Sequence, residues 1–214
     1  MDTQKSLSSF LLNSGHSIPS IGYGTGLLID GCEEAVKTAI EAGYRHIDTA
    51  RFYQNEHLIG NVLSSLLSLG KIKRSELFIS TKVWNSLGFD VETEVRASLK
   101  DLKIDYLDLC LVHWPFGQID ETFTLKQQPL HLYWCQLEKC VEKGLVKSIG
   151  VSNFSCQILC DLLSYAKIKP AVNQIENHPY LPQENLVKFC QRYKIHVTSY
   201  CSLAKGGPTK NPSK

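Results

Sequence analysis

CEEAVKTAIEAGYRHIDTARFYQNEHLIG, residues 32–60, contains one full repeat of the pattern that organises the chain. Its first part predicts a helix with Val36 and Ile40 on one face, and Gly43 stands where a helix would end. The run His46–Ala50 then predicts a short strand, and a second helical pattern begins a few residues later. This order of helix, strand and helix indicates an α/β unit.

The same alternation continues along the chain. Short β-branched or apolar runs, each predicted as a strand, occur at Ile21–Gly26, His46–Ala50, Leu77–Val83, Tyr106–His113, Val146–Ser152, Ala171–Ile175 and His196–Tyr200. Helical patterns separate them at about 32–43, 55–69, 90–103, 131–143, 155–167 and 182–193, with candidate N-caps at Asp30, Asn55, Asp90 and Ser155. Repeated strand–helix–strand units predict a parallel sheet in an α/β fold.

Two parallel architectures compete at this point. A doubly wound sheet would carry Gly-x-Gly-x-x-Gly after its first strand, but Gly22, Gly24 and Gly26 are spaced by twos. A β/α barrel is the other possibility. The segment from Phe10 to Pro19 predicts a hairpin that turns near residues 13–15 and could cap the bottom of such a barrel.

Composition excludes several classes of protein. The 214 residues carry 23 Lys and Arg against 21 Asp and Glu, a net charge of +2, which gives no reason to expect nucleic acid as a partner. The eight cysteines lack Cys-x-x-Cys spacing, which favours reduced thiols. The N-terminus resembles no signal peptide and no run of about 18 apolar residues occurs, so we expect a cytoplasmic protein with no membrane partner. We expect one domain over residues 1–206 and a disordered tail at 207–214.

Polar residues stand at the ends of the predicted strands. In a β/α barrel the carboxyl ends of all strands converge on one face, where active sites are built. A buried lysine and a buried aspartate would each need a partner, and they can serve one another. The residues in these positions are Asp48, Lys82, His113, Ser152, Asn153, Gln174, Glu176, Asn177 and Tyr200.

Tyr53 follows Asp48 by five residues and completes a chemically specific set. An ammonium near a phenol makes the phenol a stronger acid, so a tyrosine beside a lysine can donate a proton near neutral pH. A histidine from another strand can hydrogen-bond the oxygen that receives this proton. With no metal cluster and no nucleophile motif, the set predicts proton delivery to a carbonyl oxygen with an external hydride donor.

Seven segments of the chain carry a resemblance to a known family. They are GYGTG (22–26), GYRHIDTARFYQNEHLIG (43–60), LFISTKVW (77–84), YLDLCLVHWP (106–115), GLVKSIGVSNF (144–154), PAVNQIENHPYLPQ (170–183) and VTSYCSLAKG (197–206). In these motifs and in their order the chain resembles the aldo-keto reductases of the aldose reductase type. The resemblance implies a (β/α)8 TIM-barrel fold that uses a nicotinamide cofactor, usually NADPH, to reduce aldehydes and ketones.

The resemblance also implies roles for individual residues. Tyr53 would give the proton, Lys82 paired with Asp48 would make it a better acid, and His113 would orient the carbonyl. His113 would thereby contact the substrate. Trp84 and Trp114 stand just past strand ends, where either core packing or an apolar substrate pocket fits them, and we expect the pocket. The cofactor would meet Gly24, Thr25, Asp48, Ser152, Asn153, Gln174, Tyr200 and Leu203, with Tyr200 against the nicotinamide ring and no metal involved.

The chain departs from the family at its C-terminal end. Cys201-Ser202-Leu203 replaces the usual Ser-Pro-Leu, and no segment matches the family's eighth strand, its C-terminal helices or its 2′-phosphate segment. We therefore expect a barrel that lacks the eighth strand, a monomer that could associate through its open edges. The alternative is a truncated, non-catalytic relative: a binding or scaffold fragment, or an unstable product. A third, weaker possibility is another barrel enzyme such as a sugar-phosphate isomerase.

Other aromatic and histidine residues have no such context. We expect Trp134, inside a helical pattern, to belong to the core. The histidines without a catalytic context are expected to be structural or exposed, and they are His46, His57, His131, His178 and His196.

Overall fold

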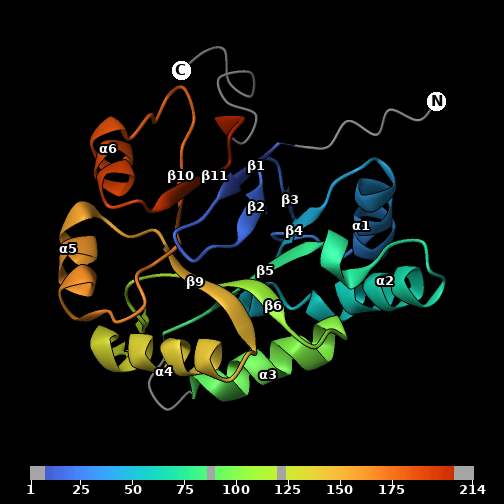
Figure 1. The fold of residues 1–214 in the computed structure, drawn as a ribbon, viewed down its shortest axis with the longest axis horizontal. Coiled ribbons are helices and arrows are strands. Elements are labelled where there is room, and N and C mark those ends of the chain that lie inside the picture. Colours follow the sequence, from blue (N-terminus) through green and yellow to red (C-terminus); the bar gives the residue numbers. More distant parts are fainter. Residues whose placement is uncertain (1–7, 86–89, 120–123, 205–214) are drawn as a thin grey trace.

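The computed structural model describes residues 8–85, 90–119 and 124–204 and shows a nearly closed barrel of parallel strands surrounded by helices (Figure 1). The strands of the barrel are β3 (Tyr23–Gly24), β4 (His46–Asp48), β5 (Phe78–Val83), β6 (Leu107–Val112), β9 (Val146–Ser152), β10 (Val172–Glu176) and β11 (His196–Tyr200). The helices outside it are α1 (Cys32–Glu41), α2 (Glu56–Ser68), α3 (Val91–Leu102), α4 (Leu130–Glu142), α5 (Cys156–Tyr165) and α6 (Glu184–Arg192). The predicted barrel is thus confirmed over the described residues, and the doubly wound sheet is excluded.

The strand order across the sheet is β11-β10-β9-β6-β5-β4-β3. Each barrel strand therefore lies beside the barrel strand that precedes it in the sequence. This order, with a helix between each pair of successive strands, is what βαβ units produce. Within the described residues the sheet ends at β3 on one side and β11 on the other. No eighth strand joins them there, as the sequence predicts.

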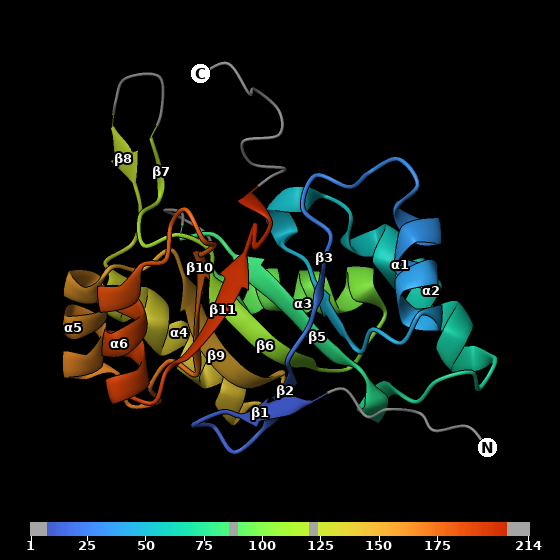
Figure 2. The ribbon, with the colours of Figure 1, turned by 90° about the horizontal axis from the view of Figure 1, so that it is seen from above.

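A hairpin of β1 (Ser9–Leu11) and β2 (Ser17–Pro19) covers the end of the barrel that contains the strand N-termini (Figure 2). Leu12 and Ile18 are buried and pack with Phe78, Leu109 and other apolar residues inside the barrel. The hairpin predicted near residues 10–19 is therefore present, and its apolar side chains fill the lower barrel.

Two hydrogen bonds tie this hairpin to strands far along the chain. The Asn13 amide donates to the Pro170 carbonyl at 2.9 Å, and the Ser14 and Ser148 hydroxyls lie 2.8 Å apart. These contacts link the N-terminal hairpin to β9 and to the residues that precede β10.

The larger apolar core lies between the strands and the surrounding helices. Trp134 is 1% exposed in α4, and its indole N–H donates to the Ile168 carbonyl at 3.1 Å, which confirms its core position. Helices α2 and α3 touch closely at Gly60, where an added Cβ would lie 2.0 Å from the Asp101 carbonyl oxygen. Only glycine allows this approach.

The predicted helix caps are confirmed at two of four positions. Asp90 accepts from the Thr93 amide at 2.8 Å, and Ser155 accepts from Ile158 at 3.5 Å. The prediction at Asp30 is wrong because α1 begins after Gly31, whose φ of 70° suits glycine. Asn55 precedes α2 but does not cap it with its side chain, which is used elsewhere.

A two-stranded ribbon, β7 (Gln118–Ile119) with β8 (Leu125–Lys126), projects at the end opposite the hairpin β1–β2 (Figure 2). All eight cysteines are free thiols, as expected. None of the helices in the described ranges has the length and apolar character needed to cross a membrane. The tail predicted at 207–214 lies outside the described residues.

Candidate active site

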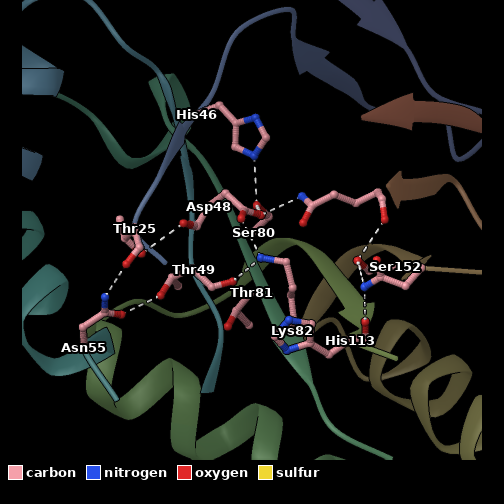
Figure 3. A network of polar contacts seen from close by, with 12 residues as sticks. Thr25, His46, Asp48, Thr49, Asn55, Ser80, Thr81, Lys82, His113 and Ser152 are labelled. Atoms are coloured by element: carbon pink, nitrogen blue, oxygen red, sulfur yellow. Dashed lines mark hydrogen bonds and ion pairs between the residues drawn. The ribbon is translucent and has the colours of Figure 1, made fainter. Parts of the chain in front are cut away.

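Asp48 and Lys82 form an ion pair at the carboxyl ends of two neighbouring strands, β4 and β5, in which Lys82 is buried and Asp48 is 16% exposed (Figure 3). The Lys82 ammonium is 1% exposed and donates to Asp48 Oδ2 at 2.5 Å and to the Thr49 carbonyl at 2.9 Å. Burial acts to raise the pKa of Asp48, but the Lys82 ammonium and the hydrogen bonds from Lys82 and Ser80 outweigh it and hold that pKa below its usual value. Asp48 is therefore a carboxylate at neutral pH.

The second oxygen of Asp48 is also held. Its Oδ1 accepts from the Ser80 hydroxyl at 2.7 Å and from the Gln174 amide at 3.1 Å. Gln174 lies on β10, across the barrel, so this bond closes the network over the barrel interior. The carboxylate is thus fixed from three sides.

Tyr53 and His113 meet above this pair. Tyr53 ends a short 3₁₀ helix, η1 (Arg51–Tyr53), and the Lys82 ammonium lies 5.1 Å from the centre of its ring. The His113 ring stands edge-on to Tyr53, with 5.7 Å between ring centres. The structure therefore brings Asp48, Tyr53, Lys82 and His113 together, as predicted.

His113 is a neutral imidazole at neutral pH. Burial, and then the positive charge of Lys82, lower the pKa of His113 to about 4, against the opposing effect of Asp48. Its Nδ1 is buried without a hydrogen-bond partner among the described residues. A neutral imidazole still carries one N–H, which can donate to a ligand oxygen.

A cavity of about 390 Å³ opens onto this cluster. This volume is within the range of roughly 300–1,000 Å³ that is usual for small-molecule sites. Its lining residues are Gly24, Gly26, Asp48, Tyr53, His113, Trp114, Ser152, Asn153, Gln174, Tyr200 and Cys201.

Amide and hydroxyl groups form one side of the cavity. The Tyr200 hydroxyl donates to Asn153 Oδ1 at 2.8 Å, and the Asn153 amide donates to the His113 carbonyl at 3.0 Å. Ser152 donates to the Gln174 carbonyl at 2.9 Å. Burial, and then nearby Glu176, raise the pKa of Tyr200, so its phenol keeps the proton that it donates.

Aromatic rings form another side. Trp84 packs against Phe52 and His113, with ring centres 5.1 Å apart in both pairs. Trp114, which lines the cavity, packs against Phe116 at 5.4 Å. Trp84 thus lies behind His113 and outside the cavity lining, whereas Trp114 lies in it.

Two of the predicted cofactor residues differ from the rest in their surroundings. Thr25 is fully buried, and both its amide and its hydroxyl donate to the Asp48 carbonyl, at 2.9 and 3.1 Å. Leu203 is 88% exposed and does not line the cavity. Thr25 therefore braces the Asp48 backbone, and Leu203 lies apart from the cluster.

Sequence reasoning missed two members of this network, Ser80 and His46. His46 is 3% exposed, and its Nε2 lies 2.9 Å from the Ser80 hydroxyl. The expectation that His46 is structural or exposed is thus incomplete: it is buried and it contacts the group that binds Asp48. Strand alternation places His46 on the same face as Asp48 and Ser80 on the same face as Lys82, because each pair is two residues apart, but it does not reveal the contact between the two strands.

Asn55 supports the loop after β3. Its amide donates to the Thr25 and Leu28 carbonyls at 2.8 and 2.9 Å, and its Oδ1 accepts from Thr49 at 2.9 Å. This use of the side chain explains why Asn55 does not cap α2. No group of three or more potential metal ligands occurs within the described ranges.

Comparisons with known proteins find relatives over most of this chain. The model of the Aldo/keto reductase family matches residues 21–213. Aldose reductase B of Dictyostelium discoideum is 46% identical over 92% of this chain and 70% of its own length.

Solved structures are similar in fold as well. The aldose reductase of Schistosoma japonicum superposes with a TM-score of 0.87 at 38% identity, over 92% of this chain and 70% of that one. A Bombyx mori aldo-keto reductase in complex with NADP gives 0.84 at 36% identity, over 91% and 66%. The chain thus spans about two thirds of the length of these relatives.

Proposed function

This chain belongs to the aldo/keto reductase family, and from that premise we propose that it reduces aldehydes and ketones to alcohols with NADPH as the reductant. The observation that carries the proposal is the cluster of Asp48, Tyr53, Lys82 and His113 around one cavity. When bound, NADPH supplies the hydride to the carbonyl carbon and leaves as NADP.

Tyr53 is the proposed proton donor to the carbonyl oxygen. Its ring lies 5.1 Å from the Lys82 ammonium, whose charge stabilises negative charge on the phenol oxygen as the proton leaves. Asp48 holds the Lys82 ammonium in position at 2.5 Å. His113, neutral because burial lowers its pKa to about 4, donates a hydrogen bond that orients the carbonyl.

The polar side of the cavity fits the nicotinamide end of the cofactor. A primary carboxamide needs both acceptors and donors, and Ser152, Asn153 and Gln174 supply hydroxyl and amide groups there. The Tyr200 ring offers a flat surface for stacking. A second cavity of about 640 Å³ shares Gly24, Asp48 and Gln174 with the first and extends between β3 and β11 toward the hairpin β1–β2.

The substrate side is apolar. Trp114 lines the cavity, and Trp84 supports His113 from behind. These rings favour a carbonyl compound with an apolar or aromatic group beside the reacting carbon.

The test is a steady-state assay of cofactor absorbance with NADPH and a panel of aldehydes, comparing the parent with Tyr53→Phe. We expect the variant to lose at least about 100-fold in kcat, because it lacks the acidic hydroxyl. Tyr193→Phe, on the exposed end of α6, is the matched control and should keep the parent rate. A Tyr53→Phe variant as active as the parent would refute Tyr53 as the donor.

Within the described residues no strand pairs with the outer edge of β3 or of β11, and these edges motivate a second candidate, a non-catalytic relative that binds without turning over. Titration of the chain with NADPH, followed by tryptophan fluorescence, separates the two. Tight cofactor binding together with turnover favours the reductase, whereas a folded chain that binds NADPH and reduces none of the aldehydes favours the binding protein.

We further propose that the protein acts as a monomer in the cytoplasm. Size-exclusion chromatography with light scattering tests the first point, and a fluorescent fusion tests the second. A dimer at micromolar concentration would refute the monomer and would point to pairing through the open sheet edges.

A further inference from the structure

Two side chains, Ser80 and His46, form a hydrogen-bonded series that leads to Asp48 and has no part in the proposed chemistry. Ser80 donates to Asp48 Oδ1 at 2.7 Å, and His46 Nε2 lies 2.9 Å from the Ser80 oxygen (Figure 3). Ser80 is fully buried and His46 is 3% exposed. All three side chains lie on the inner face of the barrel.

The strand register explains why they meet. Asp48 pairs directly with Ser80 between β4 and β5, and His46 pairs with Phe78 one step below. Alternate residues of a strand point to the same side, so His46 and Asp48 share one face of β4, and Ser80 and Lys82 share one face of β5. Ser80 thus stands between the imidazole and the carboxylate.

Proton accounting fixes the direction of both hydrogen bonds. An ionised carboxylate only accepts, so the single Ser80 hydroxyl proton is used toward Asp48. The Ser80 oxygen then has only lone pairs to offer His46, and His46 Nε2 must carry a proton. Burial above all lowers the pKa of His46 to about 4, so the ring is neutral and Nδ1 is its bare nitrogen.

We propose that Ser80, oriented by the Nε2–H of His46, is a positioning residue that holds the Asp48 carboxylate with Oδ2 on Lys82. This inference rests on the proposed reductase function for its consequence in catalysis. Among the described residues, the only other donor to Asp48 Oδ1 is the Gln174 amide. Gln174 is also a proposed contact of the nicotinamide carboxamide, so the cofactor would compete with Asp48 for this side chain. Ser80 is therefore the donor that stays on the carboxylate when the nicotinamide carboxamide engages Gln174.

The first test needs neither a variant nor activity. Nitrogen-15 NMR of the parent chain, labelled at histidine, reports which imidazole nitrogen carries the proton. We expect His46 to be neutral and protonated at Nε2 from pH 6 to 8, a range chosen well above its folded pKa of about 4. A ring protonated only at Nδ1 would overturn the proposal, whatever the enzyme does.

The second test removes the hydroxyl. In Ser80→Ala, carbon-13 NMR of the Asp48 carboxyl should show its titration moved to higher pH, and Ser80→Thr, which keeps a hydroxyl, should restore it. A carboxyl titration that is the same in Ser80→Ala as in the parent overturns the proposal. Circular dichroism confirms that each variant is folded before it is compared.

The third test uses turnover. We expect Ser80→Ala to lower kcat about tenfold and to leave KM for the aldehyde unchanged. Ser80→Thr should restore kcat. Adding His46→Leu to Ser80→Ala should lower kcat no further. His57→Gln is the matched control, because His57 is exposed on α2, away from this network. Equal kcat in Ser80→Ala and the parent refutes the role. A parent chain without turnover refutes the proposed function instead and leaves the two NMR tests to decide.

Discussion

Replacing Lys82 by methionine, Asp48 by asparagine, and both together tests the energetics of the buried pair. The Lys82 ammonium is 1% exposed and has two acceptors, Asp48 Oδ2 at 2.5 Å and the Thr49 carbonyl at 2.9 Å. Asp48 keeps two further donors, Ser80 and Gln174, on its other oxygen. Each single change therefore leaves one buried charge without its counterion but not without hydrogen bonds.

These contacts set the expected magnitudes. Removing one partner from a buried ion pair costs roughly 3–5 kcal/mol in the free energy of unfolding. Because each remaining charge keeps at least one hydrogen bond, we expect values near the lower end, about 3 kcal/mol for Lys82→Met and for Asp48→Asn. Independent effects would sum to about 6 kcal/mol, but the double variant leaves no unpaired charge and should lose no more than about 3 kcal/mol.

Urea unfolding at neutral pH, followed by tryptophan fluorescence, measures all four free energies. Lys143→Met is the matched control: Lys143 also lies 2.5 Å from a carboxylate, that of Glu92, but its side chain is 50% exposed. Because solvent screens that exposed pair, Lys143→Met should leave the free energy of unfolding nearly unchanged. A double variant whose loss equals the sum of the single losses within about 0.5 kcal/mol would refute the coupling.

Three further predictions concern stability. Burial lowers the pKa of His46 to about 4, while the value in the unfolded chain is about 6.5. The free energy of unfolding, measured with urea, should therefore be highest above pH 6.5 and fall by about 3 kcal/mol toward pH 4. His46→Gln should remove this part of the pH dependence. Gly60→Ala should lower stability by about 1–3 kcal/mol, despite the better helix propensity of alanine, because its Cβ would meet the Asp101 carbonyl at 2.0 Å; an unchanged Tm contradicts this. Glu56→Gln should cost about 2 kcal/mol by urea unfolding, because the 2% exposed carboxylate pairs with Arg51 at 3.0 Å, and no loss would mean that this pair is not stabilising.

The strands, the helices and the N-terminal hairpin could be predicted because each follows from local periodicity. Val36 and Ile40 recur at helical spacing, and both are buried in α1. The strand-end positions of Asp48, Lys82 and His113 followed in turn, because parallel strands place their carboxyl ends on one face. The clustering of the four candidate catalytic side chains was thus within reach of the sequence.

What could not be predicted depends on contacts between strands. His46 could equally have been exposed, and its burial depends on Phe78 beside it and Ser80 above it, both on another strand. Asn55 has the residue type of a cap but is used by the Thr25 and Leu28 carbonyls, 27 to 30 residues earlier. Such competition between a local and a distant hydrogen bond is decided only when the chain is folded.

The hairpin β1–β2 has a consequence for the order in which this chain assembles during synthesis. Each barrel strand can pair with the one made just before it, but Asn13 must wait for Pro170, 157 residues later, and Ser14 for Ser148. At about 5–20 residues per second, a ribosome needs roughly 8 to 30 seconds to cover that distance. The first strands to leave the ribosome are therefore among the last to dock, and the apolar Leu12 and Ile18 stay uncovered until the rest of the barrel has formed around them.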